Sequence, residues 1–310
     1  MNHIPLGQGR EFDAIRDLVK RWGSAAGGIG DDAATIDVPR GEQLVISVDA
    51  FVANRHFKPA WLAAAEIGYR ATAAALSDLA AMAATPVGVL LALNVPDDWR
   101  DKVGDIGDGV AQAVRQAGTV ILGGNISDAT ELSITTTVVG HAFAPLSRRG
   151  AAVGDRLYVT GKLGGPGSAI AAWSSGTTPS ALARERFAHP VPRIREARWL
   201  ANAGATACID ISDGLMADAH HLAAASDRAI EMHIERVPCI SGVGGRDASR
   251  SGEEYELLVC APRLDAAAFH AAFGLPLTDI GSVIAGPAGV TALERGARVA
   301  GVAGHDHFSE

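Results

Sequence analysis

Hydrophobic and polar positions repeat along this chain with two different periods, and the change of period predicts where helices give way to strands. Apolar side chains recur every three or four residues from 11 to 23 and stop at a glycine, which predicts an amphipathic helix. The β-branched segment 43–52 and the threonine-rich alternation at 131–143 predict strands. The alanine-rich segment 59–83 predicts a long helix that Pro86 ends.

The rest of the chain continues this mixture of strands and helices. Because strand pairs resembling hairpins are interspersed with helices, the pattern predicts an α+β protein and not a doubly wound sheet. The polar, turn-rich segment 147–155 predicts a boundary between domains at 1–146 and 147–310. Further strands are expected at 35–38, 87–96, 119–125 (running into a glycine turn), 156–161, 207–212, 229–238, 255–262, 278–286 and 289–302. Further helices are expected at 101–118, 168–173, within 174–195, and at 196–204, 214–226 and 263–274.

Composition and charge exclude several classes of partner. The net charge is −8 and no basic stripe is present, so we expect no binding to nucleic acid. The longest apolar stretch, 71–93, contains Ser77, Asp78 and Pro86, so we expect no membrane span. The N-terminus lacks the apolar core of a signal peptide, and the three cysteines are scattered among apolar residues. These features are typical of a cytoplasmic protein with reduced thiols.

Carboxylates gather at the ends of predicted strands and in turns, and one lies inside an apolar helix. Each has a structural interpretation: Asp31 fixes a turn, Asp78 pairs with Arg70, and Asp213 caps the helix that follows it. Five or more converging carboxylates without matching lysines or arginines would instead need divalent cations, of which Mg²⁺ fits best because it takes oxygen ligands and bridges to phosphates. The residues concerned are Asp31, Asp32, Asp49, Asp78, Asp210, Asp213, Glu253 and Glu254.

Two other features carry weaker signals. The segment 161–169 is rich in glycine, but it lacks the Lys-Ser/Thr pair of a P-loop. His220 and His221 are adjacent on a predicted helix, so they cannot face one metal ion and are interpreted as a structural or surface pair.

A series of short segments occurs along the chain in the order GREFDAI, GIGDDAA, VISVDAFVANRHF, IGYRATAAALSDLAAMAATP, ILGGN, RRGAAVGD followed by YVTG, IDISDGLMAD, SGEEYELLV and DHF. This order resembles the thiamine-monophosphate kinases, a family of the aminoimidazole-ribonucleotide synthetase superfamily. The resemblance extends from Glu11 to Phe308. It implies two α/β domains, with the N-terminal sheets of a homodimer joined in a barrel, and ATP lying in a cleft lined by both domains.

The resemblance also implies an activity and a set of site residues. The activity is direct transfer of the γ-phosphoryl group of ATP to thiamine monophosphate, with several Mg²⁺ ions. The acceptor is itself a phosphate, so no general base is assigned, and His56 is expected to position the substrate. By resemblance, the metal ligands are Asp32, Ser47, Asp49, Asp78, Asn125, Asp210 and Asp213, the nucleotide contacts are Gly124, Arg149 and Ser212, and the substrate contacts are His56, Glu253 and Phe308.

The chain departs from the family pattern at three positions. Asn125 stands where the family has aspartate, so one Mg²⁺ is expected to be held less tightly. Ser251 and Glu254 replace a glycine and an aspartate beside the predicted substrate contact, and the segment 213–253 is short for the family. Two alternatives therefore stay open: an enzyme of the same fold with a different phosphorylated substrate, and a nucleotide-binding paralogue without turnover.

Overall fold

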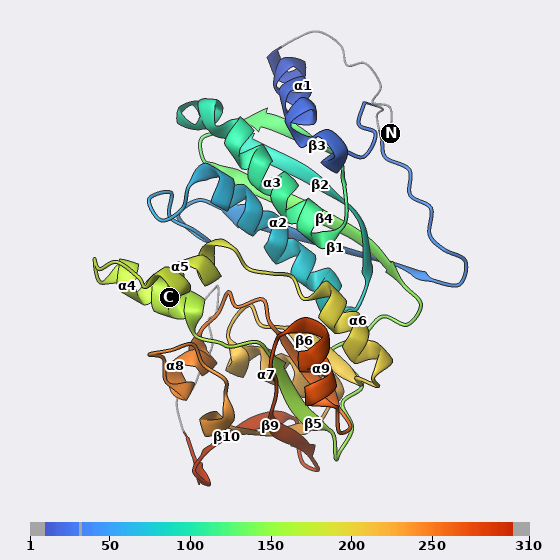
Figure 1. The fold of residues 1–310 in the computed structure, drawn as a ribbon, viewed down its shortest axis with the longest axis vertical. Coiled ribbons are helices and arrows are strands. Elements are labelled where there is room, and N and C mark those ends of the chain that lie inside the picture. Colours follow the sequence, from blue (N-terminus) through green and yellow to red (C-terminus); the bar gives the residue numbers. More distant parts are fainter. Residues whose placement is uncertain (1–9, 31–32, 300–310) are drawn as a thin grey trace. The chain divides into compact units, whose positions relative to one another are not determined.

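The computed structural model describes residues 10–30 and 33–299 and divides the chain into two compact units (Figure 1). The first unit comprises Met1–Leu79 and Ala84–Pro145, and the second comprises Ala80–Ala83 and Leu146–Glu310. Among the described residues, no helix combines the length and the apolar character needed to cross a lipid bilayer. The predicted α+β class is confirmed, because both units contain mixed sheets with helices packed against them.

The first unit is built on a four-stranded sheet in the order β1-β4-β2-β3. Its strands are β1 (Gln43–Val52), β2 (Thr85–Val95), β3 (Ile121–Asp128) and β4 (Ser133–Ala142). Neighbouring strands are antiparallel except β2 and β3, which are parallel and are joined through a helix, as parallel strands require. The strands β1 and β3 therefore form opposite edges of this sheet.

Three helices complete the first unit: α1 (Arg10–Trp22), α2 (Ala64–Ala81) and α3 (Val103–Ala117). Figure 1 shows α2 and α3 side by side over one face of the sheet. Two glycines allow their backbones to touch: a Cβ at Gly68 would lie 2.0 Å from the carbonyl oxygen of Ile106, and one at Gly109 would lie 1.8 Å from that of Ala65. The alanine-rich composition of α2 serves the same close packing.

The other face of this sheet is apolar and exposed along β1. Leu44, Ile46 and Val48 alternate with residues that point toward the helices, and their exposed fractions are 48%, 58% and 60%. Aliphatic side chains of this size are rarely left in solvent side by side in a monomer, so this surface is a candidate interface.

The second unit contains a seven-stranded sheet in the order β11-β10-β7-β9-β5-β8-β6. Its core is a cluster of aliphatic side chains from these strands and from α7, with Leu157, Ile209 and Leu222 among those almost fully buried. Its strands are β5 (Arg156–Thr160), β6 (Ala207–Asp210), β7 (Ala229–His233), β8 (Leu257–Ala261), β9 (Leu277–Ile284), β10 (Gly289–Glu294) and β11 (Ala297–Arg298). Its helices are α4 (Gly165–Ser174), α5 (Ala181–Ala188), α6 (Ile194–Asn202), α7 (Leu215–Ser226), α8 (Gly245–Arg250) and α9 (Ala266–Phe273).

Three local predictions are wrong, and one helix was missed. Residues 35–38 form no strand. Pro86 does not end a helix: α2 stops at Ala81, and Pro86 lies near the start of β2, where a proline is tolerated. The expected turn at 123–125 is part of β3, and the helix α8 was not predicted, because its six residues begin with glycine.

Candidate active site

In the first unit, candidate ligands from β1 and α2 meet on the helix-covered face of the sheet. Ser47 and Asp49 are two residues apart on β1, so their side chains share one face, opposite Leu44 and Ile46. The Ser47 hydroxyl donates a hydrogen bond to the carboxylate of Asp78 on α2. The pairing places an oxygen-rich group where the covered face of β1 meets the buried helix α2.

Gly124 and Asn125 lie on β3, at the opposite edge of this sheet. Across the sheet, Asn125 pairs with Ala92 on β2, Ala92 pairs with Thr135 on β4, and Thr135 pairs with Ala50 on β1. The Asn125 side chain therefore lies on the same face as Ala50, which is opposite to the face of Asp49. The strands β1 and β3 are three spacings apart, or roughly 14 Å. Within one chain, the structure therefore does not bring Asn125 together with Ser47, Asp49 and Asp78.

A cavity of about 710 Å³ lies in the first unit beside this β3 segment. It is lined by Gly123, Gly124 and Asn125, by apolar side chains of α1 and α3, and by residues 27–30 and 33–35 of the loop that precedes β1. A Cβ on Gly124 would lie 2.1 Å from the carbonyl oxygen of Leu91, so this position admits only glycine. The volume and apolar lining are those of a site for a flat organic group.

His56 follows β1 in a short turn of the first unit. Its Nδ1 accepts a hydrogen bond from the Val52 N–H at 3.1 Å, so the neutral ring carries its proton on Nε2. The imidazole lies 5.7 Å from the ring of Phe51, and the Phe51 ring stacks on Phe57 at 4.9 Å. These contacts fix the ring near the carboxyl end of the strand that carries Ser47 and Asp49.

In the second unit, the turn between β6 and α7 carries Asp210, Ser212 and Asp213. The N-cap residue of α7 is Gly214, which has no side chain to cap the helix, so the predicted capping role of Asp213 is wrong. Asp218, one turn into the helix, instead accepts hydrogen bonds from the N–H groups of Ser212 at 3.1 Å and Asp213 at 3.2 Å. This carboxylate therefore fixes the shape of the turn.

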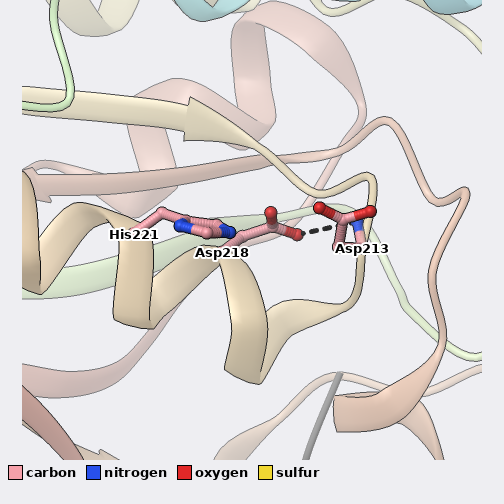
Figure 2. Close-up of side chains that lie close together, drawn as sticks. All are labelled: Asp213, Asp218 and His221. Atoms are coloured by element: carbon pink, nitrogen blue, oxygen red, sulfur yellow. Dashed lines mark hydrogen bonds between the residues drawn. The ribbon is translucent and has the colours of Figure 1, made fainter. Parts of the chain in front are cut away.

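Asp213, Asp218 and His221 form a compact group, with one ligand atom from each within 4.8 Å of the others. Figure 2 shows Asp218 between the imidazole and Asp213, with its hydrogen bond to Asp213 drawn as a dashed line. Asp218 is almost fully buried, and burial raises its pKa to about 8, with smaller contributions from Asp210 and Asp213. Carboxylates this close together repel one another unless a cation lies between them, and their oxygens are the ligands that a divalent cation such as Mg²⁺ prefers.

Two further predicted contacts lie in the second unit. Glu253 follows Gly252, its side chain is partly exposed, and its carboxylate accepts a hydrogen bond from the Tyr255 hydroxyl at 2.7 Å. The Glu253 N–H donates a hydrogen bond to the Ser212 carbonyl at 2.7 Å, so Glu253 lies beside the turn at 210–213. Arg149 is exposed, and its N–H binds the Ser147 hydroxyl at 3.1 Å.

The predicted set thus forms two described groups: Ser47 with Asp78, Asp49 and His56 in the first unit, and Asp210, Ser212, Asp213 and Glu253 in the second. The predicted ligand Asp32 and the predicted substrate contact Phe308 lie outside the described residues.

Sequence reasoning missed Asp218 and the part that His221 plays beside it. The signal was present in the spacing, because residues 218 and 221 are three apart and lie on the same face of a helix. His221 is exposed, in agreement with the surface interpretation, but it also faces the carboxylates of Asp218 and Asp213.

Comparison with family models and known proteins gives a consistent result. Residues 30–142 match the model of the AIR synthase related protein, N-terminal domain, and residues 152–293 match that of the C-terminal domain. The chain is 32% identical over 303 residues to the thiamine-monophosphate kinase of Escherichia coli (strain K12). This match covers 91% of this chain and 92% of that protein.

Solved structures agree with the sequence comparison. The crystal structure of thiamine-monophosphate kinase from Stenotrophomonas maltophilia K279a matches with a TM-score of 0.80 and 32% identity, covering 96% of this chain and 99% of that one. AaThiL complexed with AMPPCP and TMP matches with a TM-score of 0.76 and 28% identity, covering 96% and 97% of the two chains.

Proposed function

This chain belongs to the thiamine-monophosphate kinase family, within the AIR synthase related proteins, and we propose that it transfers the γ-phosphoryl group of ATP to thiamine monophosphate. The products are thiamine diphosphate and ADP. The observation that carries the proposal is the match, over 96% of the chain, to a relative that binds both AMPPCP and TMP. The two groups of candidate residues support it, because each supplies what such a transfer needs.

The first requirement is charge neutralisation between two phosphorylated reactants. Ser47, Asp49 and Asp78 in the first unit and Asp210 and Asp213 in the second are the residues that would hold Mg²⁺. When bound, Mg²⁺ neutralises phosphate oxygens and helps to orient them. His221 offers nitrogen, which Mg²⁺ takes poorly, so the ion near this turn is assigned to the carboxylates.

The second requirement is alignment of the attacking oxygen with the γ-phosphorus. The acceptor phosphate of thiamine monophosphate is already an anionic nucleophile, so no side chain has to remove a proton from it. The chain's own residues then act by positioning: His56 and Glu253 orient the acceptor, and Ser212 and Arg149 contact the nucleotide. Transfer forms one oxygen–phosphorus bond and breaks the bond between the β,γ-bridging oxygen and the γ-phosphorus.

The third requirement is a site for the nucleotide base. The cavity beside Gly124 supports this role, because its apolar side chains come from α1, α3 and β3 and its volume exceeds that of a purine. Gly124 leaves the backbone of β3 free of a side chain at the cavity wall.

We also infer that the protein acts as a homodimer through the open face of the first sheet. The support is the row of exposed Leu44, Ile46 and Val48, which a second copy would cover. Asn125 lies on this same face, at the edge away from β1, so in such a dimer it would serve the interface or a partner's site and not the Ser47–Asp78 group of its own chain.

The proposal is tested by a coupled assay of ADP release from the purified protein with ATP and Mg²⁺. Release that depends on thiamine monophosphate and yields thiamine diphosphate supports the proposal. Release only with another phosphorylated acceptor would identify an enzyme of the same fold with a different substrate. ATP binding without turnover would identify a nucleotide-binding paralogue.

A further inference from the structure

The segment that carries Glu253 has an unusual backbone. Glu253 and Tyr255 both have left-handed conformations, with φ values of +63° and +53°, although neither is glycine. Residues with a Cβ rarely adopt this region, because it is strained, and they persist there only where the surrounding structure holds them. Strong interactions must therefore hold residues 253–255 in place.

The first of these interactions is the burial of Glu254 between the two left-handed residues. Its carboxylate accepts hydrogen bonds from the Gly164 N–H at 2.6 Å and from the Ser251 hydroxyl at 2.5 Å. The Gly167 N–H in turn donates to the Ser251 hydroxyl at 2.9 Å. The glycine-rich loop before α4 thus binds a carboxyl group of its own chain.

The second interaction is a buried ion network at Glu256, one residue beyond Tyr255. Arg193 donates to both carboxylate oxygens, at 2.8 and 2.5 Å, and Arg186 donates at 3.0 Å. The Thr160 hydroxyl adds a hydrogen bond at 2.7 Å. Since Glu256 is fully buried, this network fixes the end of the segment in the core of the second unit.

The backbone of the segment is also joined to the candidate metal turn. The N–H groups of Glu253 and Tyr255 bind the carbonyls of Ser212 and Ile211, at 2.7 and 2.9 Å. The buried anchors therefore place Glu253 relative to Ser212 and its neighbour Asp213.

Within this frame, the Tyr255 side chain acts on Glu253 directly. Tyr255 is 7% exposed, so packing fixes its position. Its hydroxyl donates a hydrogen bond to Glu253 Oε2 at 2.7 Å. We propose that Tyr255 is a positioning residue that holds the Glu253 carboxylate in the orientation needed to contact the phosphoryl acceptor. This inference rests on the proposed function, because it gives Glu253 its role toward thiamine monophosphate.

The test compares Tyr255→Phe, Glu253→Ala and the double variant with the wild-type protein in steady-state kinetics. Loss of a hydrogen bond to a charged group is worth about tenfold or more, so Tyr255→Phe should raise the KM for thiamine monophosphate about tenfold and leave the KM for ATP within about twofold. Glu253→Ala removes the oxygen that accepts the tyrosine hydrogen bond, so if Tyr255 acts through Glu253, the double variant should match Glu253→Ala alone.

Tyr158→Phe is the matched control. Tyr158 is a buried tyrosine of the same unit whose hydroxyl accepts a hydrogen bond from the Leu264 N–H at 3.0 Å, away from the 251–256 segment. It should lower the melting temperature without changing the KM for thiamine monophosphate. An unchanged acceptor KM in Tyr255→Phe, or effects of the two substitutions that multiply in the double variant, would overturn the inference.

A wild-type protein that forms no thiamine diphosphate would refute the proposed function but not the positioning itself. In that case crystal structures of the wild type and Tyr255→Phe decide the matter. A Glu253 carboxylate that moves to another rotamer in the variant supports the role of Tyr255, and one that stays in place overturns it.

Discussion

Glu254 binds a proton more tightly in the folded protein than in the unfolded chain. Burial raises the pKa of this carboxyl to about 7 from the ordinary 4.5, and Glu256 adds to the rise, while the hydrogen bonds from Ser251 and Gly164 and the charge of Arg186 oppose it. The substitution Glu254→Gln keeps the length and the acceptor oxygen of the side chain but removes the titrating group. It therefore isolates the effect of the proton.

The sign and size of the effect follow from the two pKa values. Between pH 4.5 and about 7 the folded state binds a proton that the unfolded state has lost, so the stability contributed by this group is complete below pH 4.5 and is lost as the pH rises to about 7. A shift of this size corresponds to about 3 kcal/mol in the free energy of unfolding. Glu254→Gln should lack this part of the pH dependence.

The assay is urea unfolding of the wild type and Glu254→Gln at several pH values between about 5 and about 8. The difference in free energy of unfolding between the two proteins should change by about 2–3 kcal/mol across this range, in favour of the variant as the pH rises. The exposed Glu131 provides a control, since Glu131→Gln should stay within about 0.5 kcal/mol of the wild type at every pH. A difference between wild type and Glu254→Gln that stays constant with pH would refute the reasoning.

Three further substitutions test other parts of the account. Asp78→Asn removes the carboxylate that accepts the Ser47 hydrogen bond, so kcat/KM should fall about a hundredfold or more, with a higher Mg²⁺ requirement measured by metal titration. Ile46→Asp places a charge on the open sheet face and should convert a dimer into a monomer, as measured by light scattering; an unchanged mass would exclude this interface. Asn125 lies away from the Ser47–Asp78 group of its own chain, so Asn125→Asp should leave the Mg²⁺ concentration for half-maximal activity within about twofold of the wild type; a lower requirement would place residue 125 at a metal site that a partner chain completes.

The fold was largely predictable because the periodic segments are long. The helix at α1 and the strands β1 and β4 match their predicted bounds closely, since an amphipathic or alternating pattern continues through each. The wrong predictions concern segments whose composition favours one local structure while packing in the fold requires another. Gly124 indicates a turn by composition, but in the fold it lies in β3, where the backbone of Leu91 leaves no room for a side chain.

The resemblance to a family names candidate ligand-binding residues of the site, such as Asp213 and Glu253, whose roles stay predictions. It does not show which buried residues shape the backbone around them. Asp218, which binds the turn before α7, and Glu254, which binds the loop before α4, depend on contacts between residues far apart in the chain or one helical turn away. Only the folded arrangement brings those groups together.

The most direct test of the central claim follows the γ-phosphate of ATP. The protein is incubated with Mg²⁺, thiamine monophosphate and ATP labelled with ¹⁸O in the γ-phosphoryl group, and the products are analysed by mass spectrometry. Direct transfer should give one ADP for each thiamine diphosphate, with the label in the terminal phosphate of the thiamine product. Labelled inorganic phosphate with no labelled thiamine diphosphate would contradict it.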